Sequence, residues 1–260
     1  MHMTARLKNK VAIVTGAASG IGSATIEKFL DEGATVLATD INEAGLDQLL
    51  EAEEPRLTTF SSNITKYAEV EAIISKCVSE FGQVNILVNS AGITPRTLPP
   101  EADFEERWEA VMEVNAKGTF LMCHAAVEEM RQAGNGGSIV NLGSIMSLVA
   151  HPPSLPFSDG FNPYPQSKGA VLQLTRDMGI RLAPDNIRVN AVCPGFVYTA
   201  LTENVTGMPD VHETMKALHP MGRLAEPSEI ANVIAFLASD EASFVTAAAW
   251  TVDGGGYTAA

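Results

Sequence analysis

Short apolar, β-branched runs alternate with helix-like stretches along most of the chain. Seven of these runs have the near-continuous hydrophobic pattern of strands buried on both faces. They lie at 11–15, 34–40, 57–62, 84–90, 137–142, 187–193 and 247–254, and helical spacing is found at 43–51, 66–81, 104–133, 163–183 and 227–238. A further helix is expected directly after the first strand. Alternation of this kind predicts one α/β domain built on a doubly wound, parallel, seven-stranded sheet with helices on both faces.

Two segments break the alternation. Residues 148–163 are rich in proline, and residues 196–226 mix polar residues with Met and Pro. Long irregular segments inside a compact domain are usually functional, so both are expected to form substrate loops. No linker or repeat divides residues 1–260, which predicts a single cofactor-binding and catalytic domain.

Composition excludes several classes of function. Hydrophobic residues make up 46% and charged residues 18%, the balance of a soluble globular protein, and no apolar run is long enough to span a bilayer. We therefore expect a cytoplasmic protein with no membrane partner. The net charge of −14 argues against a nucleic-acid partner. Three scattered cysteines and five histidines form no CxxC or HExxH spacing, so no metal site is expected.

A Gly-rich turn, "TGAASGIG", follows the first strand and contains Gly16, Gly20 and Gly22. Between a strand and a helix, such a turn lets backbone N–H groups surround the pyrophosphate of a dinucleotide. Three glycines alone would equally fit a flexible turn. Their position in an alternating chain favours cofactor binding.

Asp40 ends the second predicted strand. A carboxylate there can accept hydrogen bonds from both ribose hydroxyls of an adenosine, and it repels a 2′-phosphate. Its neighbours Thr39 and Ile41 carry no positive charge, which favours NAD(H) over NADP(H). The alternative is a solvated carboxylate at a strand end.

Several further motifs follow the Gly-rich turn and Asp40 along the chain. They are "NSAG" (89–92), Asn115, Ser144, "YPQSK" (164–168), "PGFVYT" (194–199) and a terminal "VDGG". Over essentially its whole length the sequence resembles the short-chain dehydrogenase/reductase family, which has a Rossmann fold. The resemblance implies that Ser144, Tyr164 and Lys168 are catalytic and that Asn115 completes a proton relay through water.

The resemblance also implies the cofactor contacts. The expected cofactor-binding residues are Gly16, Ser19, Gly20, Ile21, Gly22, Asp40, Ile41, Asn63, Ile64, Asn89, Ala91, Gly92, Tyr164, Lys168, Pro194, Gly195, Val197 and Thr199. Asn89 is expected to steady the central sheet as well. Ser90 and Asn63 depart from the family pattern, which usually has Asn and Asp at these two places.

Tyr164 and Lys168 stand one helical turn apart, so their side chains are expected to face the same cleft. Asn162 can cap this helix. An unperturbed phenol has a pKa of about 10, and a nearby ammonium favours its ionised form. We therefore expect Tyr164 to be the base for alcohol oxidation and the acid for ketone reduction, with Ser144 donating to the substrate oxygen. By spacing alone, a solvated helix start would fit as well.

The substrate residues are expected from the two irregular segments. Ser144 and Tyr164 would meet the reacting group, and Phe196, His151, Phe157 and Met208 would contact the rest of the substrate. The stretch 148–163 contains no Lys or Arg. This favours an uncharged, fairly hydrophobic secondary alcohol or ketone, although the same apolar residues could simply fold their loops.

Three other functions remain open from the sequence. One is a dehydrogenase or reductase of a sugar or polyol, and another is a non-catalytic NAD-binding scaffold. An epimerase or dehydratase would need a further substrate domain. Apolar positions on the helices at 104–133 and 163–183 predict a homotetramer; they include Phe120, Leu121, Val171, Leu172 and Leu174.

Overall fold

A seven-stranded, all-parallel sheet forms the centre of the molecule. The computed structural model describes residues 5–51 and 53–256, so the ends of the predicted 1–260 domain lie outside the described residues. The strands are β1 (Val11–Thr15), β2 (Thr35–Asp40), β3 (Leu57–Ser61), β4 (Ile86–Asn89), β5 (Gly137–Leu142), β6 (Ile187–Pro194) and β7 (Ala249–Val252). Their order is β3-β2-β1-β4-β5-β6-β7, which confirms the doubly wound α/β prediction.

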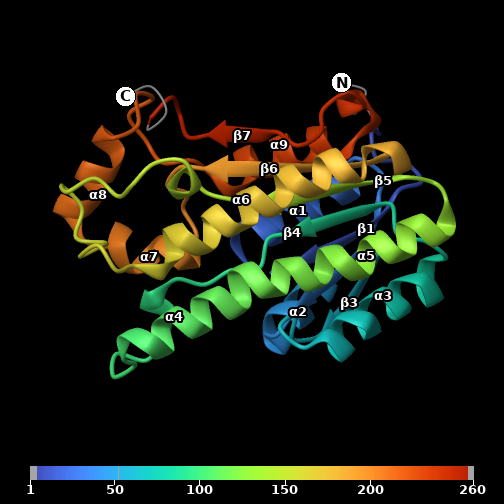
Figure 1. Ribbon diagram of the computed structural model, residues 1–260, viewed down its shortest axis with the longest axis horizontal. Coiled ribbons are helices and arrows are strands. Elements are labelled where there is room, and N and C mark those ends of the chain that lie inside the picture. The colour runs from blue at the N-terminus through green and yellow to red at the C-terminus, as the bar shows by residue number, and fades with distance from the viewer. Residues whose placement is uncertain (1–4, 52, 257–260) are drawn as a thin grey trace.

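Helices cover both faces of the sheet (Figure 1). The elements between the strands are α1 (Gly20–Asp31), α2 (Glu43–Leu50), α3 (Tyr67–Phe81), α4 (Phe104–Met112), α5 (Thr119–Ala133), α6 (Pro163–Arg181) and α9 (Pro227–Ala238). One core joins α1 and α9 to the sheet through Phe29 and Ile234. The opposite core joins α3 and α5 to the sheet through Ile73 and Met122.

The strand order reverses between β1 and β4. β3 and β2 lie on one side of β1, whereas β4 to β7 follow on the other side. Connections leave the carboxyl ends of β1 and β4 in opposite directions, which opens a crevice at this edge. The amino end of α1 follows the carboxyl end of β1 at this edge. The amino end of α6 and the short helices α7 (Ala200–Thr206) and α8 (Pro209–Ala217) lie at the same edge, on the left of Figure 1.

Two elements differ from the sequence prediction. The predicted helix 104–133 consists of α4 and α5 joined by a π-helical segment, Glu113–Gly118. The segment 196–226, expected to be irregular, contains α7 and α8. Pro209 opens α8 at the first helical position, where its missing N–H group is not needed.

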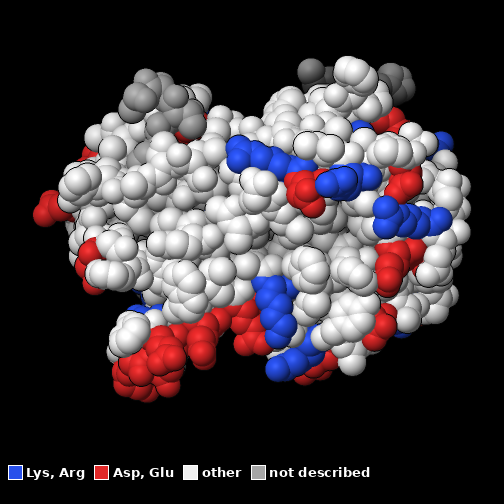
Figure 2. Space-filling view, in the orientation of Figure 1, with Lys and Arg blue, Asp and Glu red and all other residues white. Residues whose placement is uncertain are grey.

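Two of the residues predicted to form an association surface belong to the core. Val171 is 1% exposed and Leu172 is 2% exposed, whereas Phe120 is 50% exposed. Figure 2 shows acidic side chains gathered over α4 and a largely uncharged area over the first half of α6. Among the described residues, no helix is long and apolar enough to cross a membrane. In the same part of the chain, no group of His, Cys, Asp and Glu could hold a metal ion.

Candidate active site

A cavity of about 700 Å³ lies at the carboxyl edge of the sheet. Most of the predicted cofactor residues line it: Gly16, Ser19, Gly20, Ile21, Asp40, Ile41, Asn63, Ile64, Ala91, Gly92, Tyr164, Lys168, Pro194, Gly195, Val197 and Thr199. Ser144, His151 and Phe196 line it too. One cavity therefore brings together residues from nearly every loop at this edge.

The Gly-rich turn folds tightly beneath the cavity. Gly16 has a φ of +65°, and a Cβ there would lie 2.7 Å from the backbone of Ala91. A Cβ on Gly22 would clash with the carbonyl oxygen of Gly16, so Gly22 serves the packing of the turn and does not line the cavity. Only glycine fits either position.

The amino end of α1 opens into the cavity. Its N-cap residue, Ser19, makes no side-chain capping bond, and its first turn contains no acidic residue. Backbone N–H groups at such an end attract anions, and no side chain of the described residues accepts a hydrogen bond from the first turn of α1. The turn therefore fits the pyrophosphate of a dinucleotide.

Asp40 lies at the end of β2, beside this turn. Its Oδ2 accepts from the backbone N–H of Ala18 at 3.1 Å, and its Oδ1 accepts from that of Asn42 at 2.9 Å. These two bonds fix the carboxylate in the cavity wall. Its wall neighbours Thr39 and Ile41 are uncharged.

Asn89 is buried beneath the cavity and does not line it. Its amide donates to Asn141 Oδ1 at 2.8 Å, which links the ends of β4 and β5. Nearby, Thr15 Oγ1 accepts from the backbone N–H groups of Ser90 and Ala91, both at 3.2 Å. These contacts hold the "NSAG" loop against the turn after β1.

Ser144, Tyr164 and Lys168 meet on one wall of the cavity. Ser144 follows β5, and the other two lie in the first turns of α6, which Asn162 caps by accepting from the Tyr164 N–H at 2.9 Å. Lys168 Nζ donates to the carbonyl of Leu142 at 2.7 Å and lies 5.8 Å from the centre of the Tyr164 ring. The predicted one-turn spacing therefore places both groups in the same cleft.

Burial governs the ionisation of both groups in the protein alone. It raises the pKa of the Tyr164 phenol above its ordinary value, while contacts with Ser144 and the charge of Arg96 oppose the rise. Burial also lowers the pKa of the Lys168 ammonium to about 8. From the sequence, the lowering of the phenol pKa is expected from Lys168 together with the positive ring of an oxidised nicotinamide. In the protein alone, the charge of Arg96 also acts in this direction. A further positive charge close to the Tyr164 hydroxyl would bring the pKa of the phenol closer to neutral pH.

Asn115 lies in the π-helical segment behind this wall. Its Nδ2 donates to the Ile93 carbonyl at 2.9 Å and to Ser167 Oγ at 3.0 Å, and its Oδ1 accepts from the Ile93 N–H at 2.8 Å. The amide thus braces the loop after β4 against α6. Gly92 lies between Asn115 and Lys168, because a Cβ there would be 3.4 Å from both side chains.

The two substrate segments pack mainly against each other. Phe157 is buried in a small core with Leu155, Val205 and Met215 and does not line the cavity. Met208 is 50% exposed and also lies outside the cavity wall. His151 and Phe196 remain in the wall, each with a ring edge-on to that of Phe157. Most of the predicted apolar substrate residues therefore fold the loops.

Two residues of the site were missed in the sequence. Arg96, in the loop after β4, lines the cavity, whereas the sequence prediction looked for cations only in the proline-rich segment 148–163. His219 is buried beneath the "PGF" turn, where its Nε2 accepts from the Phe196 N–H at 3.2 Å. No motif flags either position, because both reach the site only through the tertiary fold.

Comparisons with known proteins agree with this geometry. A family model described as enoyl-(acyl carrier protein) reductase matches residues 16–258. A 3-oxoacyl-[acyl-carrier-protein] reductase FabG of Thermotoga maritima is 41% identical over 254 residues, covering 96% of this chain and 98% of its own. A cis-4-hydroxycyclohexanecarboxylate dehydrogenase of Sinomonas cyclohexanicum is 40% identical over 253 residues, covering 96% and 97%.

A solved structure supports the same assignment. The crystal structure of a short-chain type dehydrogenase/reductase from Mycobacterium marinum matches with a TM-score of 0.86 and 28% identity, covering 97% of each chain. Both the sequence matches and the structural match extend over nearly the whole chain, including the Gly-rich turn and the Ser144, Tyr164 and Lys168 wall. The chain therefore belongs to the short-chain dehydrogenase/reductase family.

Proposed function

We propose that this protein is an NAD(H)-dependent oxidoreductase that interconverts a secondary alcohol and a ketone. The observation that carries the proposal is a single cavity with an uncapped helix end at one side and Ser144, Tyr164 and Lys168 at the other. The relatives are named as dehydrogenases and reductases. A scaffold without activity has no need for all three side chains.

Each of the three residues has a role in this reaction. Ser144 is 7% exposed, and its hydroxyl contacts the Tyr164 phenol, so it can donate to the substrate oxygen as negative charge develops there. Tyr164 takes the proton of the alcohol or returns it to the ketone. Lys168 holds the nicotinamide ribose with N–H groups that Leu142 does not occupy. The nicotinamide supplies the hydride chemistry when bound.

Asn115 supports this wall from behind. Its side chain fixes the loop that carries Gly92, next to Lys168. We assign it the proton relay through water that the family resemblance implies, in addition to this bracing role.

NAD(H) is the proposed cofactor because of Asp40. The carboxylate is held in place by two backbone N–H groups, at the position of an adenosine ribose. A 2′-phosphate would meet a fixed like charge there. Of the described residues that line the cavity, Arg96 and Lys168 alone are Lys or Arg, and both act close to Tyr164, at the catalytic end of the cavity.

The substrate body is proposed to be fairly hydrophobic. Apolar wall residues beyond the catalytic group include Leu98, Ile145, Met146 and Phe196. One relative acts, by its name, on a ring that carries a secondary alcohol. The absence of Lys and Arg from 148–163 favours an uncharged substrate, but Arg96 brings a positive charge to the cavity from another loop.

We also propose a cytoplasmic homotetramer. Three aromatic side chains are exposed on α4 and α5: Phe104 by 83%, Trp108 by 46% and Phe120 by 50%. Large exposed apolar side chains are typical of an association surface. Light scattering at micromolar concentration should give four times the chain mass of 27.6 kDa, and a monomer would contradict the proposal.

Substitution of Tyr164 tests the proposed reaction. Tyr164→Phe should reduce NAD-dependent turnover of secondary alcohols by at least about 100-fold, because the proton acceptor is lost. Tyr67→Phe is the matched control, since Tyr67 lies on the outer surface of α3. Tight NADH binding with no turnover of any alcohol or ketone would instead favour the scaffold.

A further inference from the structure

Arg96 presents a positive charge to the substrate side of the cavity. Among the described residues it makes no hydrogen bond or ion pair, and its guanidinium lies over the ring of Phe157, 4.9 Å from the ring centre. The side chain remains exposed to the cavity. A guanidinium stacked on an aromatic ring keeps its N–H groups free for a further partner.

The loop that carries Arg96 is firmly held. Arg96 lies in the short 3-10 turn Pro95–Thr97. Arg107 of α4 donates to four carbonyls of this loop, those of Pro95 at 3.1 Å, Pro99 at 3.4 Å, Pro100 at 2.9 Å and Ala102 at 2.8 Å. The Thr97 hydroxyl donates to the Thr94 carbonyl at 2.7 Å. Arg96 is therefore positioned by its loop before any ligand arrives.

His151 presents a second polar group beside the same ring. Its imidazole lies edge-on to Phe157, with ring centres 5.9 Å apart, and it lines the cavity. Both ring nitrogens are buried without a hydrogen-bond partner among the described residues. Burial and the charge of Arg96 lower the pKa of His151, so the imidazole is neutral near pH 7. A buried imidazole with neither nitrogen bonded is unfavourable unless water or a ligand supplies the partner.

Arg96 is also electrostatically close to the reacting group. Its charge acts on the Tyr164 phenol as well as on His151. Because Tyr164, His151 and Arg96 line the same cavity, a molecule whose alcohol lies at Tyr164 can reach Arg96 with its other end. Among the described residues that line the cavity, the carboxylates are Asp40, at the adenosine end, and Glu113, which is paired with Lys117 at 2.9 Å.

We propose that Arg96 and His151 form a binding subsite for a carboxylate of the substrate. Resting on the proposed function, this makes the substrate a hydroxy acid or oxo acid whose carboxylate lies away from the reacting carbon. The planar guanidinium binds a carboxylate through two N–H groups, and the neutral imidazole donates one hydrogen bond. The subsite carries one positive charge, that of Arg96, which matches a carboxylate better than a dianionic phosphate.

Binding without turnover tests the subsite independently of the reaction. Titration calorimetry in the presence of NADH would compare cyclohexanecarboxylate with cyclohexanecarboxamide, two ligands of nearly the same shape. We expect the carboxylate to bind at least about 10-fold more tightly, and Arg96→Gln to remove this preference. Equal or weaker binding of the carboxylate by the unmodified protein would overturn the proposal. Tighter binding of cyclohexyl phosphate would also contradict the assignment to a carboxylate.

Kinetics with matched substrates tests the same subsite during the reaction. Hydroxylated cyclohexanecarboxylates and their primary amides would be compared by the ratio of their kcat/KM values. Arg96→Gln should lower the acid-to-amide ratio about 100-fold, Arg96→Lys less, and His151→Phe about 5-fold. The control is Arg131→Gln, because Arg131 pairs with Asp185 on the surface. An unchanged acid-to-amide ratio in Arg96→Gln would refute the subsite. If the unmodified protein turned over none of these alcohols, the proposed function would be refuted instead.

Discussion

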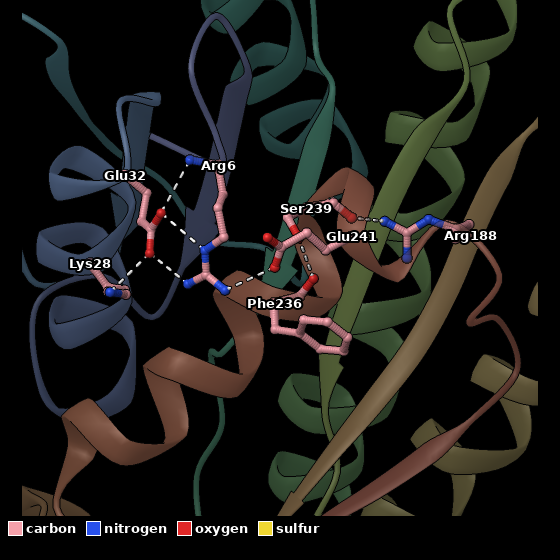
Figure 3. A network of polar contacts seen from close by, with 7 residues as sticks. All are labelled: Arg6, Lys28, Glu32, Arg188, Phe236, Ser239 and Glu241. Atoms are coloured by element: carbon pink, nitrogen blue, oxygen red, sulfur yellow. Dashed lines mark hydrogen bonds and ion pairs between the residues drawn. The ribbon is translucent and has the colours of Figure 1, made fainter. Parts of the chain in front are cut away.

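Charged side chains at the two ends of the sheet differ in whether they have polar partners. At the amino end, Glu32 is bound by Arg6 Nε at 3.1 Å and by Lys28 Nζ at 2.9 Å (Figure 3). In the same network Arg188 donates to the Ser239 carbonyl at 3.0 Å. At the carboxyl end, Arg96 has no polar partner among the described residues.

The difference separates groups that stabilise the fold from groups that act on a ligand. Arg6 lowers the pKa of the Glu32 carboxyl to about 2, which shows a charge stabilised by its partners. Lys168, by contrast, has its pKa lowered to about 8 by burial, which shows a charge that the fold destabilises. A pKa shifted because burial destabilises the charged form is typical of functional sites. Substitutions at the amino end should therefore lower the free energy of unfolding, and substitutions at the carboxyl end should lower turnover.

The largest effect is expected from Lys168→Met. Turnover should fall about 1000-fold, because the ribose contact and a positive charge near the phenol are lost. Stability should not fall with it, since the change also removes a buried ammonium. Turnover with a secondary alcohol and urea unfolding of the same sample would measure both properties. A loss of more than about 2 kcal/mol in the free energy of unfolding would place Lys168 with the structural network instead.

Cofactor choice should change next most strongly in Asp40→Ser. The substitution removes the carboxylate that would repel a 2′-phosphate, so the NADP-to-NAD ratio of kcat/KM should rise about 100-fold. Steady-state kinetics with both cofactors measures the ratio. Asp47→Ser on α2 is a suitable control, because Asp47 is exposed outside the cavity. A protein that already prefers NADP would contradict the role of Asp40.

Glu32→Gln should lower stability and leave turnover intact. The folded-state pKa of about 2 lies below the ordinary 4.5. Glu32 therefore stabilises the fold fully above pH 4.5, and this contribution is lost as the pH falls toward 2. We expect a loss of about 2 kcal/mol at pH 7, and the difference between the two proteins should shrink with acid. Chemical unfolding at several pH values tests both statements. An equal loss at every pH would exclude the carboxylate as the cause.

The smallest expected effect is a pH dependence due to Lys168. Its folded-state pKa of about 8 is below the ordinary 10.5, so the unfolded chain binds more protons between these values. The free energy of unfolding should therefore rise with pH in this window relative to that of Lys168→Met, by about 1 kcal/mol for each pH unit. The quantity to measure is the difference between the two unfolding curves. A difference that falls or stays constant with pH would contradict burial as the cause of the shift.

Local patterns in the sequence predicted the fold and the catalytic wall. Buried strands are nearly continuous apolar runs, and the spacing of Tyr164 and Lys168 is set by one helical turn. The sequence could not place Arg96, because its direction depends on a turn held by Arg107. Apolar character also could not distinguish Phe157, which packs between loops, from Phe196, which lines the cavity.

A titration of the Tyr164 phenol tests the central claim most directly. The ultraviolet difference between the unmodified protein and Tyr164→Phe reports ionisation of this hydroxyl. In the protein alone we expect a pKa above the ordinary value of 10.0, because burial raises it. With oxidised NAD bound, the pKa should fall toward neutrality. A hydroxyl that stays protonated above about pH 9 in the NAD-bound protein, while alcohol oxidation proceeds at full rate, would contradict the account.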